Sequence, residues 1–178
     1  MSTRFIPAAA AAAVLALAGC ASSVDAPVAA VPPQLRAPAG ETLALVVPAR
    51  GVQIYECRAR KDTPSQFEWA FVAPDAELLD RQGRRIGRHG AGPVWEALDG
   101  SRVKAVVRER ADAPAAGAIP WLLLGAEASG PQGTFSAVRS IQRVNTVGGV
   151  APRDGCSPAT AGQSARVAYT ADYYFFRR

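Results

Sequence analysis

Residues 94–110, VWEALDGSRVKAVVRER, carry the clearest indication of the fold. Two runs of alternating apolar and polar side chains, at 94–98 and 102–110, are separated by Asp99-Gly100. Alternation with a period of two is typical of a β-strand with one buried face, and Asp-Gly is a strong signal for a tight hairpin turn. The stretch therefore predicts two antiparallel strands joined by a short turn.

The sequence on both sides of this hairpin shows similar short segments, separated by turn residues that include many of the 14 Pro and 16 Gly. We expect further strands at 42–47, 52–58, 68–72, 77–80, 85–89, 121–127, 138–144 and 167–176, with turns at 48–51 and 82–83. The pattern predicts an all-β fold, a single-domain β-sandwich or barrel of about eight to ten mostly antiparallel strands. It does not separate the sandwich from the barrel.

The N-terminal residues have the pattern of an export signal. Arg4 precedes an apolar run at 5–18, which at 14 residues is shorter than the roughly 20 that a membrane-spanning helix needs. The tetrapeptide Leu17-Ala18-Gly19-Cys20 resembles the lipobox of bacterial lipoproteins. We expect residues 1–19 to be a lipoprotein signal peptide and Cys20 to be acylated. An ordinary secretory signal cut near Ala18 or Ala21 is the alternative.

This interpretation gives the chain a place in the cell and a domain plan. Residue 21 is Ala, which resembles the pattern that sends lipoproteins to the outer membrane, so we expect an exported, lipid-anchored protein of the bacterial envelope facing the periplasm. Residues 20–30 read as an Ala/Pro-rich tether, and 31–178 as one domain. Cys57 and Cys156 are then an even pair in an oxidising compartment, which predicts a disulfide; two buried thiols are the alternative.

The formal net charge is +5, and eight basic side chains fall between residues 81 and 110. A surface formed by these basic side chains is either exposed to solvent or binds anionic lipid or polysaccharide. The sequence contains no recognised nucleic-acid-binding motif, and an exported protein does not meet nucleic acid, so we expect no nucleic-acid partner.

Several ordered motifs in the chain resemble the family catalogued as domain of unknown function 3455. They are GVQIYEC at 51–57, GRHGAGPVWE at 87–96, IPWLL at 119–123 and IQRVNTVGG at 141–149. The resemblance runs from about Val31 to Phe176. It implies no activity, substrate or catalytic residue.

The best candidate for a ligand site is the segment from residue 87 to Ser101. His89 lies among glycines, and Trp95 and Glu96 follow on opposite faces of one strand, with Asp99 at the turn. Trp beside imidazole and carboxylate groups suits stacking on a sugar or aromatic ring. In the structural alternative Trp95 is core and His89 caps a bend. Asn145, in the loop NTVGGVAP, is a second candidate.

The single histidine excludes the usual zinc and two-histidine metal sites within one chain, so we expect no metal and no cofactor. We expect a binding module for a small molecule, glycan or peptide, with an exposed Trp95 and a concave pocket. The alternative is a structural or assembly lipoprotein that contacts envelope proteins, with an apolar patch and no pocket. An enzyme would place His89 within hydrogen-bond reach of Glu96 or Asp99.

Overall fold

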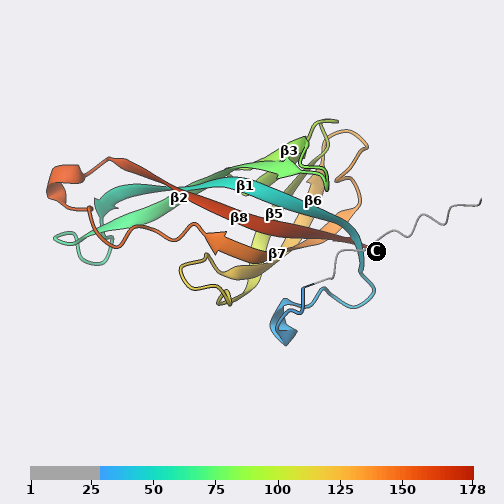
Figure 1. The fold of residues 1–178 in the computed structure, drawn as a ribbon, viewed down its shortest axis with the longest axis horizontal. Helices are drawn as coiled ribbons and strands as arrows, with labels where there is room; N and C mark the ends of the chain where they lie inside the picture. The colour runs from blue at the N-terminus through green and yellow to red at the C-terminus, as the bar shows by residue number, and fades with distance from the viewer. Residues whose placement is uncertain (1–28) are drawn as a thin grey trace, which may run out of the picture.

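In the computed structural model, which describes residues 29–178, eight antiparallel strands form a closed barrel in which each strand is hydrogen-bonded to the next (Figure 1). The predicted signal peptide, Cys20 and residues 20–28 of the tether lie outside the described residues. The strands are β1 (Thr42–Ala59), β2 (Phe67–Leu79), β3 (Arg85–Gly90), β4 (Val94–Ala97), β5 (Arg102–Ala111), β6 (Trp121–Ser129), β7 (Val138–Gly148) and β8 (Ser164–Arg177). Two 3-10 turns, η1 (Pro33–Leu35) and η2 (Pro158–Thr160), complete the elements of this part of the chain.

The barrel closes because β1 pairs with β8 along most of its length, from Thr42 opposite Arg177 to Glu56 opposite Ser164. The far ends of β1, β2 and β8 continue beyond the barrel as a long ribbon, on the left of Figure 1. The first and last strands therefore complete the ring. None of the helices in this range has the length and apolar character needed to cross a membrane.

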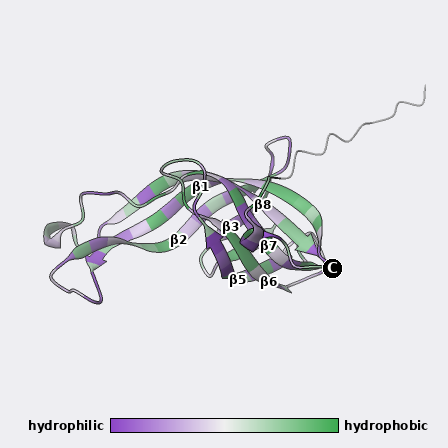
Figure 2. Cartoon of the chain, turned by 90° about the horizontal axis from the view of Figure 1, so that it is seen from below, coloured by the Kyte–Doolittle hydropathy of each residue, from purple (hydrophilic) through white to green (hydrophobic). Residues whose placement is uncertain are grey.

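The interior of the barrel is filled by alternate side chains along the strands. Figure 2 shows the corresponding bands of high and low hydropathy along the ribbon. Tyr169, Ala171, Tyr173 and Phe175 of β8 all belong to this interior cluster. Phe175 stacks on Phe135, with 4.7 Å between ring centroids. The period of two seen in the sequence therefore marks the side chains that fill the barrel.

A second apolar cluster lies on the outer side of β6, β7 and β8, beneath residues 29–37, which we call the N-terminal strap. Leu35 of the strap is fully buried. Its carbonyl accepts a hydrogen bond from Nε2 of Gln142 at 2.6 Å, and the amide of Ala29 donates to Oη of Tyr174 at 3.2 Å. The strap thus gives the outward side chains of three strands an apolar partner.

The predicted turn at 48–51 is wrong, because these residues lie inside the continuous strand β1. Pro48 is tolerated because this part of β1 is paired with β8 but lies beyond its last pair with β2, at Ala49. A Cβ atom at Gly51 would lie 2.2 Å from the carbonyl oxygen of Asp75. Gly51 is therefore needed for the close approach of two strands, and not for a turn.

The predicted strands at 68–72 and 77–80 are likewise one strand, β2, which continues through Pro74. Other predictions are confirmed. The hairpin at 94–110 is β4 and β5, and Gly100 has the positive φ of 82° that its turn requires. Cys57 and Cys156 form a disulfide that joins β1 to the loop before η2.

Candidate functional site

A side opening leads into the barrel because β3 and β4 are short. The pairs between β2 and β3 end at Ala76, and those between β4 and β5 end at Lys104. Beyond these points, the segment of β2 that contains Phe71 and the segment of β5 that contains Val107 have no strand of the described chain between them. The wall of the barrel is therefore interrupted next to the β3–β4 turn.

A cavity of about 200 Å³ lies behind this opening. Residues from all eight strands line it, together with the turn that joins β3 and β4. The lining residues are Gln53, Phe71, Val72, Pro74, His89, Gly92, Pro93, Trp95, Val107, Leu122, Leu124, Arg143 and Tyr173. Most of this wall is apolar, and a small number of polar groups face the same space, as is usual for sites that bind small molecules.

His89, one of the predicted site residues, is packed inside the barrel with 4% of its surface exposed. Its ring stacks on Trp95, with 4.1 Å between centroids and 11° between planes, and meets Tyr173 edge-on. Nδ1 lies 3.0 Å from the carbonyl oxygen of Val94. A carbonyl can only accept, so Nδ1 carries the proton and the neutral ring keeps its lone pair on Nε2.

Burial lowers the pKa of His89 to about 3, and the nearby positive charge of Arg143 acts in the same direction. The hydrogen bond to Val94 opposes this change but is the smaller effect. The ring is therefore neutral near pH 7, and Nε2 is a hydrogen-bond acceptor at the cavity.

Trp95 lines the cavity but is only 1% exposed, so the prediction that a binding module would expose Trp95 is wrong. It points inward between His89 and Tyr173 because the strand alternation places it on the interior face. Its Nε1 has no hydrogen-bond partner among the described residues. Trp95 is thus both a core residue and part of the wall.

Two further residues of the cavity, Gln53 and Arg143, were not predicted. Gln53 is 2% exposed, and its Nε2 has no hydrogen-bond partner among residues 29–178. Arg143 is half-buried, and its Nε and Nη2 donate to the carbonyl of Pro120 at 3.1 and 2.8 Å. The sequence did hold one signal for them. Side chains two residues apart on a strand point to the same face, so Arg143 lies on the same inward face as the buried Ile141.

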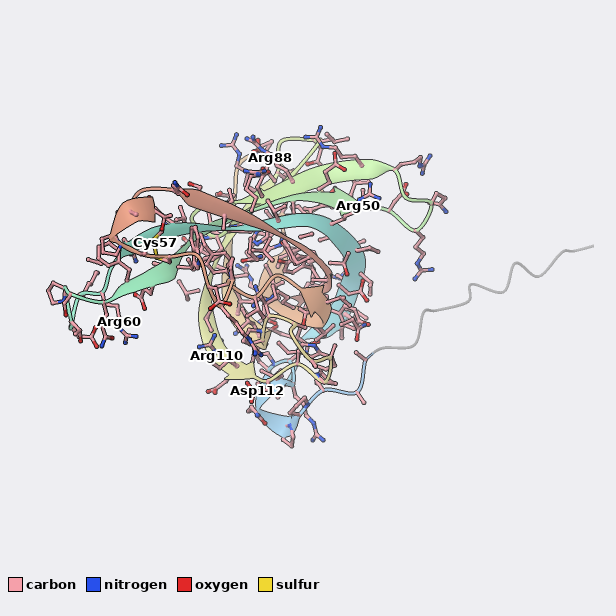
Figure 3. All side chains as sticks on the ribbon, turned by 60° about the vertical axis from the view of Figure 1, so that its left-hand side comes forward. Arg50, Cys57, Arg60, Arg88, Arg110 and Asp112 are labelled. Atoms are coloured by element: carbon pink, nitrogen blue, oxygen red, sulfur yellow. A yellow bond between two sulfur atoms is a disulfide. The ribbon has the colours of Figure 1, made fainter. Side chains whose placement is uncertain are left out.

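Glu96 lies on the outer face of β4, opposite Trp95, as the strand alternation predicts. Its carboxylate accepts hydrogen bonds from Arg88 at 2.6 Å and Arg102 at 2.9 Å, and these bonds lower its pKa. Figure 3 shows Arg88 pointing away from the barrel. Glu96 is therefore separated from His89 by the sheet, and part of the basic run is neutralised by ion pairs on the outer surface.

Asp99 organises the β4–β5 turn. One carboxylate oxygen accepts from the amide and hydroxyl of Ser101, and the other accepts from the amide and hydroxyl of Thr134. These bonds, the Ser101 hydroxyl foremost, hold the pKa of Asp99 well below its usual range. The carboxylate is fully occupied in joining two loops and does not line the cavity with His89.

Asn145 also lies outside the cavity. It has a positive φ of 51°, at an irregularity in the pairing of β7 with β8, and its Nδ2 donates to Asp172 at 2.8 Å. Of the five predicted ligand-binding residues, the structure brings His89 and Trp95 together and places Glu96, Asp99 and Asn145 elsewhere. Within residues 29–178, no three side chains of the metal-ligating types are grouped closely enough to hold an ion.

Comparison with known proteins gives a family but no activity. Searches of the curated proteins and of the solved structures found no match. A family model described as "Protein of unknown function (DUF3455)" matches residues 38–177, which include every strand of the barrel. The motifs that suggested this family from the sequence are therefore confirmed, and the chain belongs to the DUF3455 family.

Proposed function

We propose that this protein is a binding module that holds a small molecule in the side cavity of its barrel. One observation carries the proposal: residues that line an open cavity with apolar walls have buried polar atoms, Nε2 of Gln53 and Nε1 of Trp95, that find no hydrogen-bond partner in the described part of the chain. Buried donors are normally paired, by protein, by ordered water or by a ligand. A ligand at this place would pair them.

The positions of the other candidates favour binding over catalysis. The enzyme hypothesis expected Glu96 or Asp99 within hydrogen-bond reach of His89, and the group bonded to Nδ1 is instead the carbonyl of Val94. Glu96 and Asp99 are engaged on the outer face and in a turn. His89 thus acts as a fixed acceptor in the wall.

The test uses residues 29–178, whose closed ring contains all eight strands. Native mass spectrometry of this protein, secreted into the periplasm of a bacterial host, should show a retained ligand as a mass excess over the denatured chain. NMR titration with neutral probes, benzamide and octanamide, should shift resonances of the cavity wall.

Two neighbouring residues of β5 provide matched variants for this test. Val107 lines the cavity and Val106 does not, although both are exposed. Val107→Trp should fill the opening and abolish retention and probe binding, whereas Val106→Trp should leave both unchanged. Absence of any retained ligand and of any probe binding that depends on Val107 would rule out the binding function.

We also propose that the module is an envelope lipoprotein, with residues 1–19 as its signal peptide and Cys20 as the acylated residue. The Cys57–Cys156 disulfide supports an oxidising compartment. A host that expresses the full chain and is fed radiolabelled palmitate should label it, and Cys20→Ser should abolish the label. Label retained in Cys20→Ser would contradict this assignment.

A further inference from the structure

The cavity has a strong charge bias. Arg143 lines both the cavity and the groove that adjoins it, and Arg110 lines the groove. Neither lining includes an aspartate or glutamate. Arg143 also forms no ion pair with a carboxylate of residues 29–178, although other arginines of this part of the chain do. A half-buried guanidinium beside apolar walls is best stabilised by an anion.

The arrangement of donors points to a planar anion. The Nε and Nη2 groups of Arg143 are fixed by the carbonyl of Pro120, which orients the guanidinium. Gln53 lines the same two spaces as Arg143 and adds an Nε2 group that has no hydrogen-bond partner among residues 29–178. Pro120 takes Nε and one hydrogen of Nη2, so the edge left for a ligand is that of Nη1 and Nη2. This edge, with one further N–H donor from Gln53, suits the two oxygens of a carboxylate.

The rest of the wall limits the other end of the ligand. Phe71, Val72 and Val107 are each about half exposed at the opening, with 53%, 51% and 53% of their surface accessible. Large apolar side chains left exposed around a cavity indicate an apolar ligand. The neutral His89 presents a lone pair at Nε2, which repels a second anionic group. A cavity of about 200 Å³ is the size for a single ring or a short chain.

We propose that the ligand is a small apolar monocarboxylate, whose carboxylate is bound by Arg143 and Gln53 and whose hydrocarbon part lies against Phe71, Val72 and Val107. This inference rests on the proposed binding function and deepens it. The cationic and apolar parts of the wall together distinguish such an acid from a neutral hydrocarbon, which supplies no counter-ion for Arg143, and from a sugar, which leaves the apolar rim uncovered.

The experiment compares each carboxylate with its neutral isostere. Residues 29–178 are titrated at pH 7 with benzoate against benzamide, and with octanoate against octanamide, by NMR and calorimetry. The carboxylates should bind about tenfold more tightly, or better, because a charge-assisted pair is stronger than a neutral one. Arg143→Gln should bring the ratio close to one. Arg88→Gln, which removes the same charge from the outer surface, should preserve it.

The outcomes separate the two proposals. Equal binding of acid and amide by the wild type, or a preference that survives in Arg143→Gln, overturns the inference while amide binding still supports the binding function. Binding of neither class overturns both. If Arg143→Gln does not fold, the wild-type comparison still decides, and Gln53→Leu provides the second variant, in which the preference should fall.

Discussion

The buried His89 makes the stability of the barrel depend on pH between 7 and 5, where few other side chains of the chain change their protonation. His89 is the single histidine of the chain. Burial, reinforced by Arg143, lowers its pKa in the folded state to about 3, from 6.5 in the unfolded chain. The unfolded state therefore binds a proton more readily. Stability contributed by the neutral ring is complete above about pH 6.5 and is lost as the pH falls towards 3.

The size of the effect follows from the two values. Between pH 7 and pH 5 the unfolded histidine becomes almost fully protonated and the folded one stays neutral, which removes about 2 kcal/mol from the free energy of unfolding. Carboxylates with lowered pKa, such as Asp99, contribute little here because their unfolded forms are protonated mainly below about pH 4.

Urea unfolding, followed by tryptophan fluorescence at pH 7 and at pH 5, measures this loss for residues 29–178. His89→Phe is the matched variant, since a phenyl ring keeps the stack on Trp95 and cannot be protonated. Its stability at pH 7 will change for other reasons, among them the lost bond to Val94, so the comparison is between the two pH dependences. If wild type and variant lose the same free energy from pH 7 to pH 5, His89 is not a buried neutral residue and the assignment of Nε2 as an acceptor is wrong.

Three other predictions concern features that hold the barrel together. Gly51→Ala should lower the free energy of unfolding by about 1–3 kcal/mol, because the new Cβ would overlap β2. Gly90→Ala is the control, since no atom lies within 4 Å of its new Cβ, and it should change the free energy little. Equal effects of the two variants in urea unfolding would contradict the close approach of β1 and β2. Replacing Cys57 and Cys156 by serine should cost about 4–5 kcal/mol in the chain-entropy model, given the separation of 99 residues, and an unchanged midpoint of thermal unfolding would exclude a stabilising disulfide. Asp99→Asn should lower the melting temperature at pH 7 and make that temperature fall less steeply below pH 4. The lowered pKa of Asp99 means that the stability its carboxylate contributes is present above about pH 4 and is lost below it. Melting temperatures equal to those of the wild type at pH 7 and below pH 4 would show that the turn does not depend on the carboxylate.

Local pattern was sufficient for the class of fold and for most strands. The alternation at 94–110 and its Asp-Gly turn involve residues that are neighbours in sequence, and β4 and β5 formed there. Pro48 and Gly51 misled because their usual meaning is a turn. In this barrel Pro48 lies where β1 is not paired with β2, and Gly51 lies where β1 and β2 nearly touch. Both environments are set by residues of β2, which are distant in the sequence.

The site was half predictable for the same reason. His89 and Trp95 lie opposite each other in the β3–β4 pair, so one short segment brings them together. Arg143 and Gln53 come from β7 and β1 and reach the cavity only when the barrel is closed. Whether sandwich or barrel formed, and therefore which polar residues would meet, depended on the pairing of β1 with β8, which has no local signature.

That pairing also determines when this protein is able to fold. β1 pairs with β8, the last strand, and the N-terminal strap packs on β7 and β8. Neither end of the described chain therefore reaches its native contacts until nearly all of it has been synthesised. Folding dominated by such distant contacts is slow, because the entropy of closing a long loop is lost before the contacts form. The Cys57–Cys156 bond, which joins residues 99 positions apart, links β1 to the segment before β8 and so ties together two parts of the chain that meet late.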